Sequence, residues 1–130
     1  MDSHPQNSID AKEMITEIAV SDLSKSRDWY SKLFGKVPDL EPFEGNVEFK
    51  IGGAWVQISK GSVTPSSWLL NIEVRDLARE RERLHGVHIE ATEIKGVPNV
   101  ISYFDVRDPD GNALRLFQVL TSDPKVTGNR

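Results

Sequence analysis

The residue types that carry out most enzyme chemistry are scarce in this chain. Its 130 residues include no cysteine, which excludes thiolate metal sites, cysteine nucleophiles and disulfide bonds. The histidines are His4, His85 and His88, and the last two flank Gly86, where a helix is expected to end, so they form no ligand pair on one element. Neither a Gly-x-Ser-x-Gly nor a His-Glu-x-x-His motif occurs. The remaining candidates for chemistry are carboxylate, amide and guanidinium side chains.

The overall charge and hydropathy restrict the partners of the protein. The net charge is −4, and no cluster of Lys and Arg suited to neutralising phosphates is present, which argues against a nucleic-acid partner. No stretch approaches the roughly 18 apolar residues of a membrane span, and Met1–Lys12 lacks the apolar segment of a secretory signal. We therefore expect a soluble cytoplasmic protein with no membrane partner.

Two halves of the chain repeat the same order of motifs. Val20-Ser21-Asp22-Leu23 corresponds to Val74-Arg75-Asp76-Leu77 at an offset of 54, and the strand that begins at Gly53 corresponds to the one that begins at Gly111 at an offset of 58. Each half is expected to form a strand, a helix that ends at a glycine (Gly35 or Gly86), and three further strands. The expected helices are 24–34 and 77–85, and the expected strands are 14–20, 39–43, 47–51, 55–59, 68–74, 88–94, 100–106 and 112–120.

These elements predict a single domain over residues 13–120, made of modules 14–59 and 68–120. The polar segments 1–12 and 121–130 are expected to be a flexible arm and a flexible tail. Asp108-Pro109-Asp110-Gly111 predicts a hairpin turn between the last two strands, because Pro presets one turn dihedral and Gly accepts a positive φ.

The ordered set of these motifs resembles the vicinal oxygen chelate superfamily, the group of glyoxalases, bleomycin resistance proteins and extradiol dioxygenases. The residues that carry the resemblance are 20–26, Trp29-Tyr30, Leu33-Phe34-Gly35 and 108–112, and it covers about residues 14–120. It implies an α+β fold in which two βαβββ modules with curled mixed sheets form a cup. It also implies a homodimer, since pairing of modules within or between chains closes such cups.

The resemblance also implies four positions at which the family commonly binds one divalent metal. These positions correspond to Ile15, Gln57, Leu69 and Arg115. Ile15 and Leu69 have no lone pair to donate, and Arg115 would place a cation next to the metal. Only Gln57 could act as a ligand, so we expect no metal and no other cofactor.

Steps of two residues along each strand from these positions give the side chains that should line the cup. The ligand-binding candidates combine two aromatic and four polar side chains: Trp55, Gln57, Asn71, Glu73, Arg115 and Phe117. Glu17 is the candidate catalytic residue, as a general base. Arg115 either forms an ion pair with Glu17 or Glu73, or binds an anionic group of the ligand.

Two functions of different kinds remain open. The first is a metal-free protein that binds a small aromatic or anionic molecule in the cup, as the bleomycin resistance branch does when it sequesters a drug. The second is an enzyme of the same superfamily, an isomerase, lyase or dioxygenase-like protein. Such an enzyme would either use Glu17 or Glu73 with Arg115, or depend on a metal whose ligands lie elsewhere.

We predict a homodimer, because a single curled four-stranded module leaves strand edges and one sheet face uncovered. Light scattering at micromolar concentration should give about twice the chain mass of 14.6 kDa. A mass near that of one chain would contradict this prediction.

Overall fold

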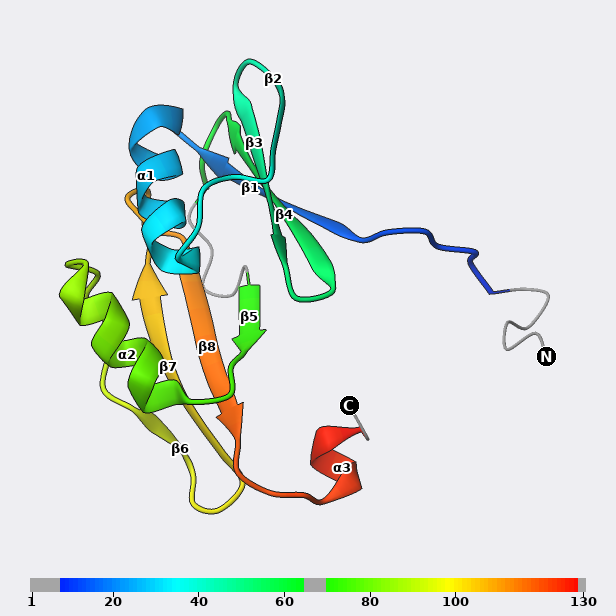
Figure 1. Ribbon diagram of the computed structural model, residues 1–130, viewed down its shortest axis with the longest axis vertical. Coiled ribbons are helices and arrows are strands. Elements are labelled where there is room, and N and C mark those ends of the chain that lie inside the picture. The colour runs from blue at the N-terminus through cyan, green and yellow to red at the C-terminus, as the bar shows by residue number, and fades with distance from the viewer. Residues whose placement is uncertain (1–7, 65–69, 129–130) are drawn as a thin grey trace.

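The computed structural model describes residues 8–64 and 70–128, and these form two modules with the same order of elements (Figure 1). The first module contains β1 (Ile15–Val20), α1 (Leu23–Phe34), β2 (Leu40–Phe43), β3 (Asn46–Ile51) and β4 (Ala54–Lys60). The second contains β5 (Leu70–Glu73), α2 (Leu77–Gly86), β6 (Lys95–Val97), β7 (Ile101–Arg107) and β8 (Ala113–Val119), followed by the short helix α3 (Pro124–Thr127). None of the helices in the described part of the chain is long and apolar enough to cross a membrane.

The two sheets have the same topology and the same register. Their strand orders are β1-β4-β3-β2 and β5-β8-β7-β6, and the first pair in each order is parallel while the others are antiparallel. Glu17 lies opposite Gln57 in the first sheet, and Asn71 lies opposite Arg115 in the second. These pairs are related by the offsets of 54 and 58, so the α+β fold and the duplication predicted from the sequence are confirmed.

The two long helices begin in the same way and end differently. Asp22 and Asp76 cap α1 and α2, and each carboxylate accepts a hydrogen bond from the backbone N–H three residues later, at 3.1 Å. Gly35 ends α1 with φ 71°, as predicted. The same prediction for Gly86 is wrong, because Gly86 is the last residue of α2 and the left-handed residue there is His88, with φ 64°.

The sixth strand is shorter than predicted and displaced along the chain. The predicted strand 88–94 is not formed, and β6 covers only Lys95–Val97. At Thr92 the backbone N–H donates to the carbonyl of Asp105, but the Asp105 N–H donates to the Thr92 hydroxyl, each at 2.9 Å. A side chain thus takes the place of a backbone acceptor at Thr92. The regular ladder between β6 and β7 therefore does not extend from Lys95 back to Thr92. Helix α3 lies within the predicted tail, for which no element was expected.

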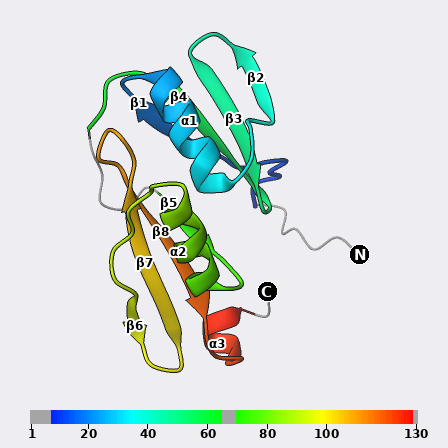
Figure 2. The ribbon, with the colours of Figure 1, turned by 60° about the vertical axis from the view of Figure 1, so that its left-hand side comes forward.

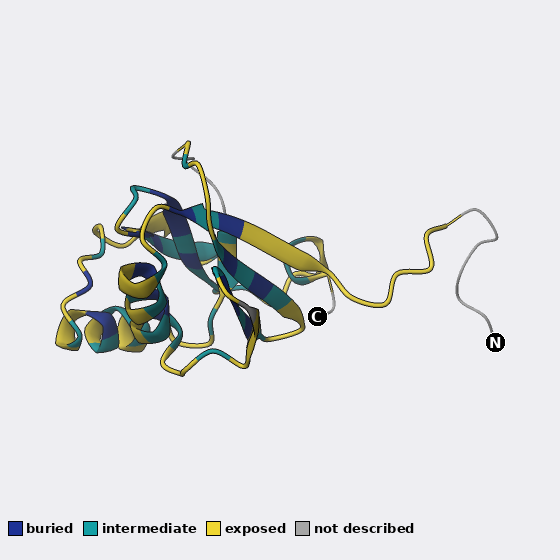
Figure 3. Cartoon of the chain, turned by 90° about the horizontal axis from the view of Figure 1, so that it is seen from above, coloured by how far each residue is buried: buried dark blue, intermediate teal, exposed yellow. Residues whose placement is uncertain are grey.

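Each module packs its helix against one face of its own sheet (Figure 2). Buried and less buried residues alternate along the strands (Figure 3), as the two-residue period of a strand requires. The buried set includes Ile18, Val56 and Tyr30 from the first module and Phe104 and Leu114 from the second, in one continuous core. We call the face of each sheet opposite to its helix the open face. The two sheets do not close into the predicted cup within this chain.

The predicted hairpin turn forms and holds the buried carboxylate of Asp108. The Gly111 N–H donates to the Asp108 carbonyl at 2.9 Å, and Gly111 has φ 86°. The Asp108 side chain accepts hydrogen bonds from the backbone N–H groups of Asp110 and Asn112, at 2.9 and 2.8 Å. The turn therefore satisfies a carboxylate that is only 5 % exposed.

The same carboxylate joins the two modules. The hydroxyl of Tyr30, on α1, donates to Asp108 Oδ2 at 2.6 Å, and the amide of Asn112 donates to that oxygen at 2.8 Å and to the Ala19 carbonyl at 3.3 Å. Ser21 donates to Asp110 through its backbone N–H at 3.0 Å and through its hydroxyl. Side chains of the β7–β8 turn thus fix the end of β1 and the middle of α1.

We predict that this contact makes the free energy of unfolding fall at alkaline pH. Burial, with the hydrogen bond to Asp108, raises the pKa of Tyr30 above its ordinary value of 10.0. The unfolded chain therefore loses this proton above about pH 10 while the folded chain keeps it, so stability is complete below that pH and declines above it. Tyr30→Phe should cost about 1.5–3 kcal/mol at pH 7, because it removes a buried hydrogen bond to a charged group.

Urea unfolding of both proteins between pH 7 and 11 measures this effect. The difference in free energy of unfolding between wild type and Tyr30→Phe should shrink above about pH 10, because only the wild type carries the ionising group. A difference that stays constant over this range would contradict the prediction.

Candidate functional site

The open face of the β5–β8 sheet carries four of the predicted ligand-binding residues. One cross-strand row contains Asn71, Arg115 and Asp105, and the next contains Glu73, Phe117 and Tyr103. Asn71 and Glu73 are exposed, while the other four are half-buried. The face therefore combines a cation, three carboxylate or amide groups and two aromatic rings.

Arg115 is held in place by two neighbours on β7. Its Nε donates to Asp105 Oδ1 at 2.8 Å and its Nη2 donates to Asp105 Oδ2 at 3.2 Å, so the ion pair is bidentate. The guanidinium carbon lies 3.7 Å from the centroid of the Tyr103 ring, a cation–π distance. Hydrogen bonding to Asp105 raises the pKa of Arg115, which keeps the side chain charged.

The ion pair differs from the sequence prediction, which proposed Glu17 or Glu73 as the partner of Arg115. Neither Asp105 nor Tyr103 is among the predicted site residues. A signal for Asp105 was present in the sequence, because a three-residue turn at 109–111 that ends in a left-handed glycine pairs Asp108 with Asn112 and hence Asp105 with Arg115.

The open face of the β1–β4 sheet carries Glu17, Trp55 and Gln57. The Gln57 amide donates to Ser59 Oγ at 3.0 Å and to Glu17 Oε2 at 3.4 Å. The ammonium of Lys50 lies 5.7 Å from the centre of the Trp55 ring. Glu17, Gln57 and Ser59 border an open hollow of about 780 Å³.

Glu17 and Arg115 were expected to act together, and the structure places them on different sheets. Glu17 contacts Gln57 of its own sheet, and Arg115 contacts Asp105 and Tyr103 of the other. Among the described residues, the hydrogen-bond partners of the two side chains thus lie on separate sheets.

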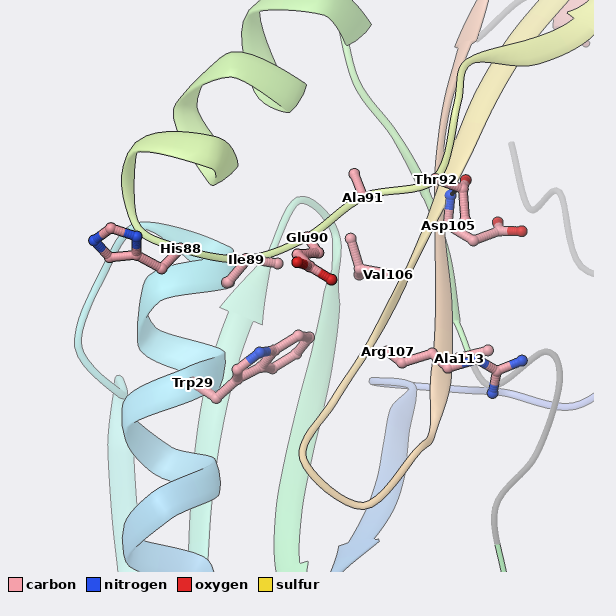
Figure 4. Close-up of a pocket in the computed structure, with 10 residues that line it drawn as sticks. All are labelled: Trp29, His88, Ile89, Glu90, Ala91, Thr92, Asp105, Val106, Arg107 and Ala113. Carbon is pink, nitrogen blue, oxygen red and sulfur yellow. Dashed lines mark hydrogen bonds between the residues drawn. The ribbon is translucent and has the colours of Figure 1, made fainter.

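A second hollow, of about 800 Å³, lies between α1 and β7 (Figure 4). Trp29 is half-buried and borders this hollow together with Glu90. Figure 4 shows that the Asp105 carboxylate points away from Trp29. Asp105 also borders this hollow, so the hollow adjoins the ion pair of Asp105 and Arg115.

The four positions at which a metal was considered do not supply a metal site. Ile15 is apolar and 55 % exposed, and Gln57 lies on the same sheet as Ile15. Arg115 is paired with Asp105, and Leu69 lies outside the described residues. Within residues 8–64 and 70–128, no three His, Asp or Glu side chains lie close enough together to hold a metal ion. The donor set present at these positions does not fit a divalent cation, which requires several oxygen or nitrogen donors.

Comparison with known families gives one match, which spans most of the chain. Residues 14–116 match the model of the glyoxalase/bleomycin resistance protein/dioxygenase superfamily. No curated protein sequence matches the chain significantly.

Solved structures with the same fold are similar at low sequence identity. A glyoxalase/bleomycin resistance protein from Catenulispora acidiphila superposes with a TM-score of 0.75 at 21% identity, covering 84% of this chain and 99% of that one. A lactoylglutathione lyase from Agrobacterium tumefaciens gives 0.68 at 20% identity, covering 88% and 95%. The fosfomycin resistance protein of Listeria monocytogenes gives 0.70 at 17% identity, covering 85% and 94%. At these identities the likeness establishes the fold.

We predict that the purified protein holds no stoichiometric divalent metal. Elemental analysis should find far less than one metal ion per chain, and a chelator should leave the thermal unfolding midpoint unchanged, because residues 8–64 and 70–128 offer no ligand set to couple metal binding to folding. One tightly bound metal ion per chain would contradict this prediction.

Proposed function

Because the chain belongs to the glyoxalase/bleomycin resistance protein/dioxygenase superfamily, we propose that it is a metal-free member of this family that binds a small aromatic anion. The binding site is the open face of the β5–β8 sheet. The arrangement of Arg115 over the Tyr103 ring, with Phe117 opposite Tyr103 on the adjacent strand, carries this proposal.

Each part of the ligand has a matching group on this face. A guanidinium binds a carboxylate through two parallel hydrogen bonds, which fixes the orientation of the anion as well as its charge. The rings of Tyr103 and Phe117 are half-buried, so each presents part of its surface to a flat molecule. Asn71, exposed in the row of Arg115, adds a neutral hydrogen-bonding group.

The first sheet completes the site when a second copy of the chain covers the open face. The two open faces do not close on each other within this chain, and Trp55 and Gln57 lie on the sheet that lacks Arg115. In the proposed homodimer, Trp55 and Gln57 of one copy approach the Arg115 face of its partner. An anion would be oriented toward Arg115 and away from Glu17.

A role in drug sequestration is consistent with this site. The superfamily name includes bleomycin resistance, and one structural neighbour is a fosfomycin resistance protein. Capture of an organic anion requires only affinity, which the cation and the aromatic rings supply without a reaction. The alternative, an isomerase or lyase, needs a base beside the bound anion, and Glu73, in the row of Phe117, is better placed for that role than Glu17.

We predict that Arg115→Ala weakens the binding of 2-naphthoate, used as a flat anionic probe, by about 1.5–3 kcal/mol, the scale of a charged hydrogen bond. Arg115→Lys should recover only part of the loss, because an ammonium lacks the planar fork of a guanidinium. Isothermal titration calorimetry measures both effects. Arg107→Ala is the matched control, since Arg107 points its guanidinium at the Gly111 carbonyl, at 2.8 Å. Unchanged binding in Arg115→Ala would contradict the proposed site.

A further inference from the structure

We propose that Asp105 is a specificity-determining residue that occupies the ligand-binding edge of Arg115, so that the site admits aromatic carboxylates and rejects small aliphatic ones. The inference rests on the proposed function, because it specifies which anions the same face accepts. It makes Asp105 an internal competitor for the anionic group of the ligand.

The geometry of the ion pair supplies the first step. Asp105 uses both carboxylate oxygens, and Arg115 uses Nε and Nη2, the edge that a guanidinium commonly offers to a carboxylate. A ligand carboxylate at this edge would make the same two hydrogen bonds. It therefore has to displace Asp105, and exchanging one carboxylate for another gains nothing by itself.

Tethering gives Asp105 an advantage over a carboxylate in solution. Asp105 lies directly opposite Arg115 on the adjacent strand, so its effective concentration at the guanidinium is on the order of millimolar or higher. A small acid such as acetate offers no additional contact. Such an acid should therefore fail to bind at millimolar concentration.

An aromatic ring is the feature by which a ligand overcomes this advantage. Tyr103 and Phe117 lie opposite each other, one row away from the ion pair, and both are partly exposed. A ring attached to the carboxylate can cover Phe117 and the part of Tyr103 that the guanidinium leaves exposed, a contact that the Asp105 carboxylate does not make. Recognition of the anion is thus conditional on recognition of the ring.

The displacement requires little movement of the protein. The Asp105 side chain is 27% exposed, so solvent is available to it after it rotates away. Its backbone N–H and carbonyl remain bound to Thr92, which keeps the strand in place. Arg115 remains over the Tyr103 ring, at 3.7 Å, and stays oriented toward the incoming anion.

Calorimetry with three probes tests the proposal: 2-naphthoate, its neutral analogue 2-naphthamide, and acetate. Asp105→Asn should raise the affinity for 2-naphthoate about tenfold or more, the factor that corresponds to removing a competing charged hydrogen-bond partner. The same variant should bind acetate detectably at millimolar concentration and should leave the affinity for 2-naphthamide within about twofold of wild type. Asp105→Ser should behave like Asp105→Asn, which guards against a local effect of the asparagine amide.

Two controls identify the source of the gain. Glu93→Gln removes the same charge from a neighbouring exposed position and should not raise the affinity for 2-naphthoate. The double variant Arg115→Ala/Asp105→Asn should lose the gain. Thermal unfolding of each variant checks that the fold is retained.

The outcomes separate this inference from the proposed function. If Asp105→Asn and Asp105→Ser leave 2-naphthoate affinity unchanged or lower while Arg115→Ala still weakens it, Asp105 only positions Arg115 and the inference is overturned. A gain that persists in the double variant, or that Glu93→Gln reproduces, also overturns it. A different result would contradict only the proposed function. In that case Arg115→Ala leaves the wild-type affinity for 2-naphthoate unchanged, while the affinity gained in the Asp105 variants is lost when Arg115 is also replaced. The role of Asp105 would then stand.

Discussion

The relative position of the two modules depends on the hydrogen bonds that the buried carboxylate of Asp108 accepts. A charge that is 5 % exposed is tolerated only when hydrogen bonds satisfy it, and Tyr30, Asn112 and the backbone of the turn all donate to it. Tyr30 belongs to the first module and the turn belongs to the second. The requirement to satisfy one carboxylate therefore fixes the modules relative to each other and fixes the hairpin from which β7 and β8 extend. The register of that hairpin in turn determines which side chains face each other.

The contact between Arg115 and Asp105 follows directly from this hairpin register. With Arg107 opposite Ala113, Asp105 must lie opposite Arg115, and Tyr103 opposite Phe117. A half-buried cation in a sheet needs a partner, and Asp105 provides it at the cost of occupying the edge that a ligand would use. In the proposed site, the same ion pair both orients Arg115 and competes with the anionic group of a ligand.

The sequence was sufficient to predict features that depend on local patterns and their repetition. The repeated Asp-Leu after a strand predicted both helices, and the offsets of 54 and 58 placed Gln57 and Arg115 at equivalent positions. One error arose where a contact between distant segments decides the structure: the predicted strand 88–94 does not form, and there the Thr92 hydroxyl accepts the Asp105 N–H. Another was local, because the left-handed residue after α2 is His88 and not Gly86. The partner of Arg115 required the pairing of β7 with β8 to be worked out residue by residue.

Arg115 stands at a position where, as the resemblance implies, the family commonly has a metal-binding side chain. This difference changes how the fold can interact with an anion. In this family's usual arrangement, as the resemblance implies, His, Gln or Glu side chains hold one divalent metal. Here the position of one such donor is taken by Arg115, which carries a positive charge itself; in the proposed site this charge attracts the anion. A guanidinium does not accept electron pairs from a carbonyl or an oxygen molecule, and it serves poorly as an acid because it keeps its proton near neutral pH. Its strength lies in oriented hydrogen bonding, which favours recognition over bond rearrangement. This chemistry of the guanidinium is the physical reason why we propose ligand binding, and not a reaction, for the face that carries Arg115.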